Sequence, residues 1–396
     1  MKTETPLQAA NQLLQEGITQ YQSCQFQAAL QSWQQALALY QQLSDRRREG
    51  AALGNLGVAY EALSQLDSAI DCYQRHLSIA QEIQDIQGQH NALTNLGNIY
   101  YGLGQYQLAI ESQQQRLSLA QEEDNLALQI SILSTLGVLY HAVGNLSQGI
   151  QTYGEQLSLA QENGYSQAEG NALKNLRLAY LALGDETKAE AYHQQHLNRL
   201  QELMRESKMP FLELLQNMGL NPHEDLAGAN LQGLDLHYAD FMGANLSQAN
   251  FSQADLTLVD FSGAILREAN FSQAILSNAN LRDADLTHAD LSDTQLRTKL
   301  PRANLTGANL QRANLSSAYL PYANLTQANL QDVNLQNADL RGVNLSYANL
   351  QGADLKRAEL QDAIVDHAQF GAGLGLSESL KQELISKGAR FGDSLE

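Results

Sequence analysis

The sequence predicts a two-domain repeat protein. An all-α helix-hairpin superhelix comes first, and a right-handed quadrilateral β-helix of about 7.5 coils with a C-terminal capping helix follows. Two observations carry this prediction: apolar and small residues recur every 40 positions in the first half of the chain and every five in the second half. We place the helical repeats at 7–205, a capping and linking helix at 206–221, the β-helix at 222–371, and the last helix with its tail at 372–396.

The repeat in the first half has helical spacing. The pair Leu56-Gly57 is followed by Tyr60, and the same pattern returns at 96–100 and 136–140. Apolar residues within a unit lie three or four apart, so each of its two runs presents one apolar face. Glycine between the runs, as at Gly104, suits a helix end, and small residues such as Gly57 and Ala69 suit a close helix crossing. Each unit is therefore a helix hairpin, and five stack because one cannot bury its own apolar stripe.

From residue 226 the period is five. Leu or Phe stands at every fifth position from 226 to 296. After one four-residue step the series continues at intervals of five from Leu300 to Phe370, and in this second run Val365 is the one central residue that is neither Leu nor Phe. A small residue, mostly Ala, precedes nearly every central residue by two positions, and the residue between them is mostly Asn or Asp. Neither the period of an α-helix nor the alternation of a flat β-strand fits this pattern. A square coil with four five-residue sides does, because it turns both the central and the small residue inward.

Finer features of the coils follow from the same register. Phenylalanines that lie four sides apart, such as Phe241 and Phe261, should stack on one side of successive coils. The four-residue step beside Pro301 predicts a local loop distortion or kink.

Two short helices are expected at the ends of the solenoids. Residues 209–219 form an amphipathic run whose apolar stripe we expect to cover the end of the last helical repeat. Ser377 suits the N-cap of a helix that stops at Gly388 and hides the edge of the last coil. The glycine-rich run 371–375 lacks the βαβ setting of a dinucleotide loop, and we interpret it as a flexible joint.

Composition limits the class of protein. The 396 residues include 24 Lys and Arg against 43 Asp and Glu, a formal net charge of −19. Because a general nucleic-acid binder needs a basic surface, we expect no direct nucleic-acid binding. Two cysteines are too few for a disulfide framework and no signal peptide is recognisable, so we expect a cytoplasmic protein. Residues 125–154 contain no Asp, Glu, Lys or Arg, but polar residues interrupt the stretch and predict a buried helix rather than a membrane span.

These patterns resemble two repeat families. The Leu-Gly…Tyr…Gly…Ala spacing resembles the tetratricopeptide repeat, and residues 72–80 followed by 91–98 are similar to the long 40-residue repeats of Pins-type polarity adaptors and kinesin light chains. The five-residue series is similar to the pentapeptide-repeat family. Because both repeats are abundant and often fused in cyanobacteria, the resemblance implies a bacterial, cyanobacterial origin.

The resemblance also implies a binding groove. In such repeats the first helix of each hairpin lines the concave face, and basic residues of the second helix assist. Asn side chains there offer donors and an acceptor to the backbone of an extended or helical peptide. The candidate groove residues are Asn91, Thr94, Asn98, Tyr101, Arg75, Arg116, Ser134, His141, Asn171 and Lys174.

Motifs for catalysis or cofactor binding are few. The sequence contains no P-loop, and neither cysteine has a histidine at a spacing typical of a nucleophile. Glu190, His193 and His196 share a helical face that could hold a metal ion, but we interpret them as a solvated face of the last repeat. We therefore expect no catalytic residues, no cofactor and no metal.

The leading functional hypothesis is a non-catalytic adaptor. Its helical groove binds a protein or peptide partner, and the β-helix is a rigid spacer or second docking surface, without membrane binding. An alternative is an acidic rod that mimics duplex DNA and inhibits a type II topoisomerase. Such a rod needs a continuous negative stripe, whereas Arg302, Arg312 and Arg341 interrupt this one. A third reading is an enzyme or metalloprotein.

Overall fold

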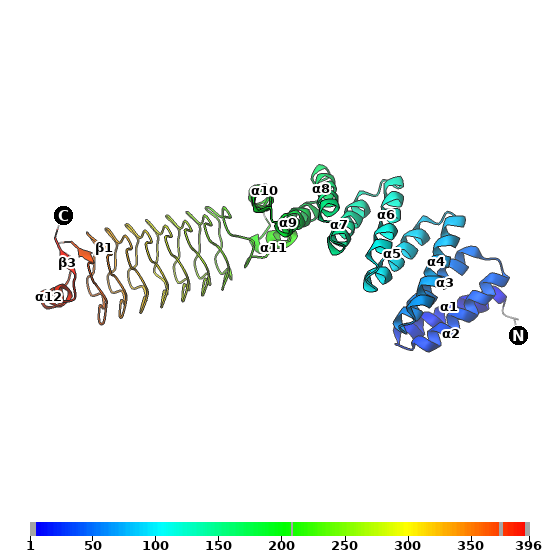
Figure 1. Cartoon of the computed structure of the whole chain (residues 1–396). Coiled ribbons are helices and arrows are strands. Elements are labelled where there is room, and N and C mark those ends of the chain that lie inside the picture. The colour runs from blue at the N-terminus through cyan, green and yellow to red at the C-terminus, as the bar shows by residue number, and fades with distance from the viewer. Residues whose placement is uncertain (1–4, 207–208, 372–374, 393–396) are drawn as a thin grey trace. The chain divides into compact units, whose positions relative to one another are not determined.

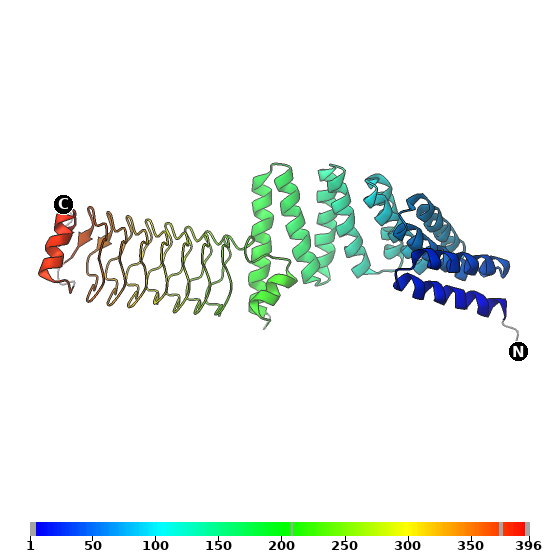
Figure 2. The same cartoon turned by 90° about the horizontal axis from the view of Figure 1, so that it is seen from below.

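The computed structural model describes residues 5–206, 209–371 and 375–392, and the chain divides into two compact units, Met1–His193 and Gln194–Glu396. Paired helices build the first unit and stacked coils dominate the second (Figures 1 and 2). The repeat helices are α1 (Pro6–Gln22), α2 (Phe26–Gln42), α3 (Arg46–Ala62), α4 (Leu66–Glu82), α5 (Ile86–Gly102), α6 (Tyr106–Glu122), α7 (Leu126–Ala142), α8 (Leu146–Glu162), α9 (Ser166–Ala182) and α10 (Glu186–Glu206). The remaining elements are α11 (Phe211–Asn217), β1 (Asn349–Leu350), β2 (Gln369–Phe370), α12 (Glu378–Ser386) and β3 (Arg390–Phe391).

The helix-hairpin repeat is confirmed, and it contains a second, shorter period. Each helix from α1 to α9 spans 17 residues, and each is followed by a turn of the same length, so the backbone repeats once per helix rather than once per hairpin. The second residue after each of these helices adopts a left-handed conformation, as at Ser64 (φ 59°) and Gly104 (φ 71°). This conformation lets the next amide bond back to the last helical turn, as Gln105 does to the Tyr100 carbonyl at 2.8 Å.

Glycines permit the close packing within hairpins. A Cβ on Gly149 would lie 3.4 Å from the Gly137 carbonyl oxygen, which is the predicted crossing of small residues. The glycines of the pairs Leu56-Gly57 and Leu136-Gly137 have another role, because each faces a tyrosine ring on the next helix. A Cβ on Gly57 would lie only 2.3 Å from the Tyr73 ring. Any larger residue at this position would displace a fully buried tyrosine.

A repeated hydrogen bond joins neighbouring hairpins at the first three junctions. The amide of Gln34 donates to the Tyr60 hydroxyl at 3.1 Å, and the pairs 74–100 and 114–140 repeat this bond at 3.2 and 2.9 Å. The fourth junction places Tyr180 at the hydroxyl position, but Gly154 takes the place of the glutamine. A Cβ there would meet nothing within 4 Å, so the site has room for the missing side chain.

The second half is a β-solenoid of stacked coils. Parallel bridges join residues four sides apart, from Asn230↔Asn250 onward, and β1, β2 and β3 form a parallel sheet in that order. The central Leu or Phe and the preceding small residues fill one continuous core. The predicted aromatic stacks are confirmed: the ring centroids of Phe241 and Phe261 are 5.5 Å apart, and those of Phe251 and Phe271 are 5.0 Å apart.

The recurring Asn and Asp have a structural role in the coils. The Oδ1 of Asn250 accepts the Ser252 amide at 3.0 Å, which fixes the corner within one coil. Its Nδ2 donates to Asn230 of the neighbouring coil at 3.1 Å. One side chain therefore satisfies the turn and links two coils, which explains why the coil repeats this residue type.

The four-residue step shortens one coil without breaking the stack. Parallel bridges continue across it with an offset shorter by one position, as in Asn280↔Lys299 and Asp285↔Asn304. The predicted local distortion is confirmed at one corner, where a bend at Thr298 replaces the turn of the neighbouring corners, and the continuous pairing shows no kink. Thr294 and Thr298 replace the small inward residues, and their buried hydroxyls donate to the carbonyls of Leu291 and Ala279. Internal hydrogen bonds thus compensate for burying two hydroxyls.

Helices contact the solenoid core at both ends of the second unit. The stripe of α11, with Leu214 and Leu215, packs into one core with Leu200 of α10 and Leu226 of the first coil. The predicted amphipathic helix therefore covers the first coil as well as the last repeat helix. At the other end, Leu384 of α12 is fully buried in the same core. The predicted joint at 371–375 includes 372–374, which lie outside the described residues.

Candidate functional site

Three hollows open in succession along the first unit, each between the first helices of neighbouring hairpins. They lie between α3 and α5, between α5 and α7, and between α7 and α9, with cavity volumes of about 460, 290 and 550 Å³. The intervening second helix also contributes to each: His76, Ile79 and Ala80 to the first hollow, Gln113 to the second and Gln156 to the third. The repeat therefore builds the same kind of hollow three times with different linings.

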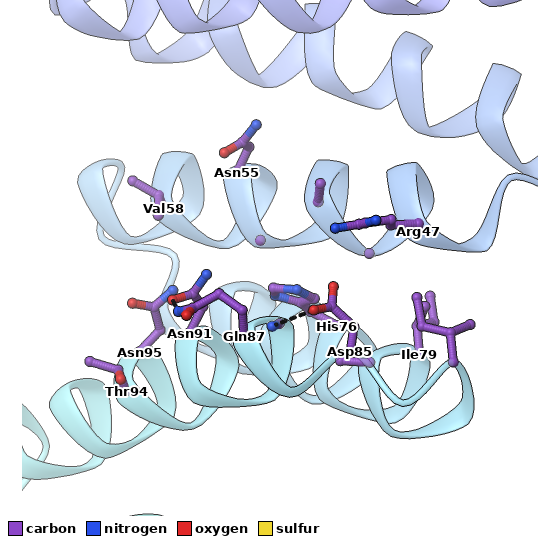
Figure 3. Close-up of a pocket in the computed structure, with 16 residues that line it drawn as sticks. Arg47, Asn55, Val58, His76, Ile79, Asp85, Gln87, Asn91, Thr94 and Asn95 are labelled. Atoms are coloured by element: carbon purple, nitrogen blue, oxygen red, sulfur yellow. Dashed lines mark hydrogen bonds between the residues drawn. The ribbon is translucent and has the colours of Figure 1, made fainter. Parts of the chain in front are cut away.

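The α3–α5 hollow combines polar side chains with the aliphatic side chains of Val58, Ile79 and Ile83. Figure 3 shows Asn55 and Arg47 on the α3 side and Gln87, Asn91 and Asn95 on the α5 side. The Gln87 amide donates to Asn91 Oδ1 at 3.0 Å, which orients the Asn91 side chain. The hollow therefore offers both hydrogen-bond donors and acceptors.

His76 packs from α4 into this hollow. Its side chain is only 9% exposed, and Nδ1 has no hydrogen-bond partner among the described residues. Gly50 and Gly54 let α3 approach the ring, because a Cβ on Gly54 would lie 3.1 Å from Nδ1. Burial lowers the pKa of His76, against an opposing effect of Asp85, so the imidazole is neutral at pH 7.

The other two hollows carry no charged lining residue among those described. Tyr101, Val138 and Leu139 give the α5–α7 hollow apolar walls, beside Asn98 and Ser134. Tyr101 and Val138 are 50% and 46% exposed, so a partner could still cover them. The α7–α9 hollow is lined mainly by small and hydroxyl residues together with Gln156, Gln167 and Asn171, and its α7 wall comes from the charge-free stretch.

Six of the candidate groove residues line these hollows. They are Asn91, Thr94, Asn98, Tyr101, Ser134 and Asn171. The hydroxyl of Thr94 is already used, because it donates to the His90 carbonyl of its own helix at 2.6 Å. Asn98, Tyr101 and Asn171 are exposed and accessible to a partner.

The remaining four candidates lie outside the hollow linings. His141 is exposed, and Lys174 is half-buried and engaged in another interaction. Arg75 is exposed and pairs with Asp71 of its own helix at 3.4 Å. Arg116 is half-buried, donates to Gln113 at 2.9 Å, and has its pKa lowered by burial. It supports the side chain that contributes to the α5–α7 hollow.

Sequence reasoning missed His76, although the repeat register contains the signal. His76, Arg116, Gln156 and His196 occupy the same position in successive repeats, where the second helix packs toward the first helices. Arg75 is one residue out of this register, which explains why it does not line a hollow. Alignment of the second helices would therefore have identified this position.

The histidines of the last repeat require a correction. His193 and His196 are 5% and 3% exposed, so they do not form the solvated face that we expected. His196 Nε2 lies 3.0 Å from the Met218 carbonyl oxygen, because it packs under α11. Within the described residues, no cluster of His, Cys, Asp and Glu is arranged to hold a metal ion. None of the described helices combines the length and the hydropathy that a membrane span requires.

Ion pairs divide the acidic surface of the solenoid. Arg302 binds Asp283 at 2.5 Å, and its hydrogen bonds hold the pKa of that carboxyl below the usual range. Similar pairs join Arg312 to Asp293, Arg267 to Asp285 and Arg341 to Asp339. Cations therefore neutralise carboxylates on several coils.

Comparisons with known proteins assign the two halves. The tetratricopeptide-repeat pattern matches residues 8–82 and 90–123, and the family described as pentapeptide repeats (8 copies) matches four successive segments, 225–263, 264–298, 298–337 and 338–371. No curated protein matches the chain significantly.

Solved structures are similar to each half separately. The nearly identical TPR-like repeats of a Podosopora anserina protein described as a putative kinesin light chain match at 17% identity, covering 52% of this chain and 100% of that one, with a TM-score of 0.42. HetL of the cyanobacterium Nostoc, a pentapeptide repeat protein involved in heterocyst differentiation regulation, matches at 33% identity, covering 41% and 84%, with a TM-score of 0.23. The chain therefore belongs to the pentapeptide-repeat family over residues 225–371, which it joins to tetratricopeptide repeats continued by helical repeats to about residue 217.

Proposed function

We propose that the protein is a non-catalytic adaptor whose helical repeats bind an extended segment of a partner protein. The observation that carries this proposal is the row of three hollows between first helices, lined by six of the residues that the sequence nominates. Tetratricopeptide repeats generally bind proteins or peptides, which agrees with this use of the surface. Exposed amide side chains such as Asn98 and Asn171 would pair with the partner backbone.

An affinity pull-down tests this function. We compare the wild-type chain with the double variant Asn98→Ala/Asn171→Ala, because both side chains are exposed and their removal spares the core. The variant should lose at least one partner that the wild type retains. Gln115→Ala, an exposed change outside the hollows, is the matched control and should retain all partners. Identical partner sets for wild type and double variant would contradict the proposal.

The pentapeptide repeats would act as a rigid spacer or second docking surface. Continuous coil-to-coil pairing and a filled core support rigidity. Paired positions lie four sides apart, so one coil has four sides, which supports a count of about 7.5 coils. Burial of Leu384 and pairing of β3 with β2 support a capping role for α12. We keep the right-handed coil, the cytoplasmic location and the cyanobacterial origin as parts of this proposal.

The DNA-mimic alternative has less support. A mimic of duplex DNA presents a continuous row of negative charge, whereas the pairs of Arg302 with Asp283 and Arg312 with Asp293 place cations among the carboxylates. Uninhibited gyrase supercoiling at micromolar protein would exclude it. Inhibition at that concentration would instead favour it over the spacer role.

A further inference from the structure

The helical groove is electrically neutral although the chain is strongly acidic. The whole chain has a formal net charge of −19. Within the described part, the charged residues that line the three hollows are Arg47 and Asp85, both in the α3–α5 hollow. They carry opposite charges and come from opposite walls (Figure 3). The groove therefore differs from the rest of the surface in its charge balance.

These two residues differ from their charged neighbours. Arg46 pairs with Glu49 and Glu82, and Arg48 pairs with Asp45, so both guanidinium groups are neutralised locally. Arg47 has no ion-pair partner in the described part of the chain. Asp85 uses Oδ1 to accept the Gly88 amide at 3.1 Å as the N-cap of α5. One cation and one anion therefore remain available on opposite walls of the same hollow.

Apart from the aliphatic Val58, Ile79 and Ile83, most of the remaining side chains that line this hollow are polar and uncharged. Asn55, Asn91 and Asn95 present amides, each of which both donates and accepts. The neutral His76 ring, nine-tenths buried and with Nδ1 unpartnered among the described residues, adds a further polar group. An acidic occupant would face Asp85 and a basic one would face Arg47, so either would meet one repulsive wall. A carboxamide matches this set of donors and acceptors.

We propose that the groove binds an uncharged segment of a partner protein, placing an Asn or Gln side chain in the α3–α5 hollow and an aliphatic side chain in the α5–α7 hollow. The second assignment rests on the exposed apolar walls formed by Tyr101, Val138 and Leu139. This inference rests on the proposed adaptor function and specifies the chemistry of its partner. Because the hollows contain a single opposed pair of charges, binding is insensitive to salt.

The test is selection of short random peptides displayed on phage against the full-length protein. Enriched peptides should combine Asn or Gln with an aliphatic residue at fixed spacing and lack Asp, Glu, Lys and Arg between them. Their Kd should change less than about twofold when the NaCl concentration is raised about tenfold. His76→Ala should weaken binding, whereas Ser78→Ala, an exposed change on the same helix, should not.

Two charge variants make the test reciprocal. Asp85→Asn keeps an N-cap residue for α5 and leaves the hollow positive, so selection should shift from Asn or Gln to Asp or Glu. Arg47→Gln leaves the hollow negative and should shift selection to Lys or Arg. The inference would be overturned if the wild type enriched peptides with a charged residue in place of the Asn or Gln, or if both variants selected the same residue type there. The adaptor function would stand in either case. No enrichment with the wild type, or unchanged binding to Asn98→Ala/Asn171→Ala, would overturn both.

Discussion

Gly154→Gln should stabilise the helical repeats by completing the row of bonds between hairpins. Three junctions have a Gln–Tyr hydrogen bond of 2.9 to 3.2 Å, and the fourth has Tyr180 opposite Gly154. Replacing an interior helical glycine with glutamine gains about 0.7 kcal/mol of helix propensity. The new bond to the Tyr180 hydroxyl adds about 0.5 kcal/mol on this partly exposed surface. We expect a total of about 1 kcal/mol.

Hydrogen exchange of the α8 and α9 amides measures this effect locally, which avoids assuming two-state unfolding of a repeat protein. A gain of about 1 kcal/mol slows exchange about fivefold where local opening controls it. Gly154→Met, which has about the same helix propensity as glutamine but no amide to donate, is the control. In a Tyr180→Phe background the glutamine should lose its advantage over methionine. Equal protection in the Gln and Met variants when Tyr180 is present would refute the hydrogen-bond reasoning.

Three further changes test packing, titration and thiol chemistry. Gly57→Ala should lower stability by about 1 to 3 kcal/mol, measured as the urea midpoint, because its Cβ would overlap the Tyr73 ring. Burial lowers the pKa of His76, so protonation favours the unfolded chain, and stability should fall as pH drops below about 6.5; His76→Gln should reduce this loss between about pH 7.5 and 5.5. Burial raises the pKa of the Cys72 thiol to about 11, so at mildly alkaline pH a thiol reagent should modify exposed Cys24 quickly and Cys72 only on unfolding.

The controls for these changes come from the helical repeats themselves. Gly102→Ala on α5, where a Cβ would meet nothing within 4 Å, should not destabilise the protein. An equal loss at Gly57 and Gly102 would contradict the ring-overlap argument. If His76→Gln leaves the pH dependence of stability unchanged, titratable groups other than His76 cause that dependence. Equally fast modification of both cysteines in the folded protein would show that α4 does not protect Cys72.

The sequence was sufficient to predict both repeats because each period is carried by side chains that must be buried. The turn positions were not predictable in the same way. Cys24, Ser44, Gln84 and Asp124 all adopt the left-handed conformation, yet these side chains share no chemical type. The shorter period, one helix and its turn, is thus a property of the backbone that the hairpin-long pattern of side chains conceals.

The step in the solenoid and the short helix α11 were predicted less well for different reasons. The missing residue was expected to cause a loop distortion or a kink, and only the distortion occurs, with the buried hydroxyls of Thr294 and Thr298 hydrogen-bonded inside the solenoid. The apolar stripe of α11 indicates that this helix packs against another element, but the stripe alone does not identify which elements it contacts. Leu215 is buried both by α10 and by the first coil, because the two contribute to one core.

The groove was predictable at the level of helix faces and less so at the level of single residues. Repeat register correctly placed Asn91 and Asn98 beside hollows. The choice of Arg75 followed charge rather than register, and its side chain pairs with Asp71 instead. The register of the second helices marks the position of His76, but its contribution also depends on Gly50 and Gly54 of the preceding helix, which that alignment does not show.

Pairing between coils also determines how the solenoid comes apart. An inner coil is hydrogen-bonded to the coils before and after it, so it must break both sets of bonds to leave the stack. A terminal coil breaks one set, together with the helix that packs on it. We therefore expect unfolding of the solenoid to begin at a terminal coil and to proceed toward the inner coils. The native-state lifetime of this half, and its resistance to proteases, should depend on α11 and α12 more than on the long run of coils between them.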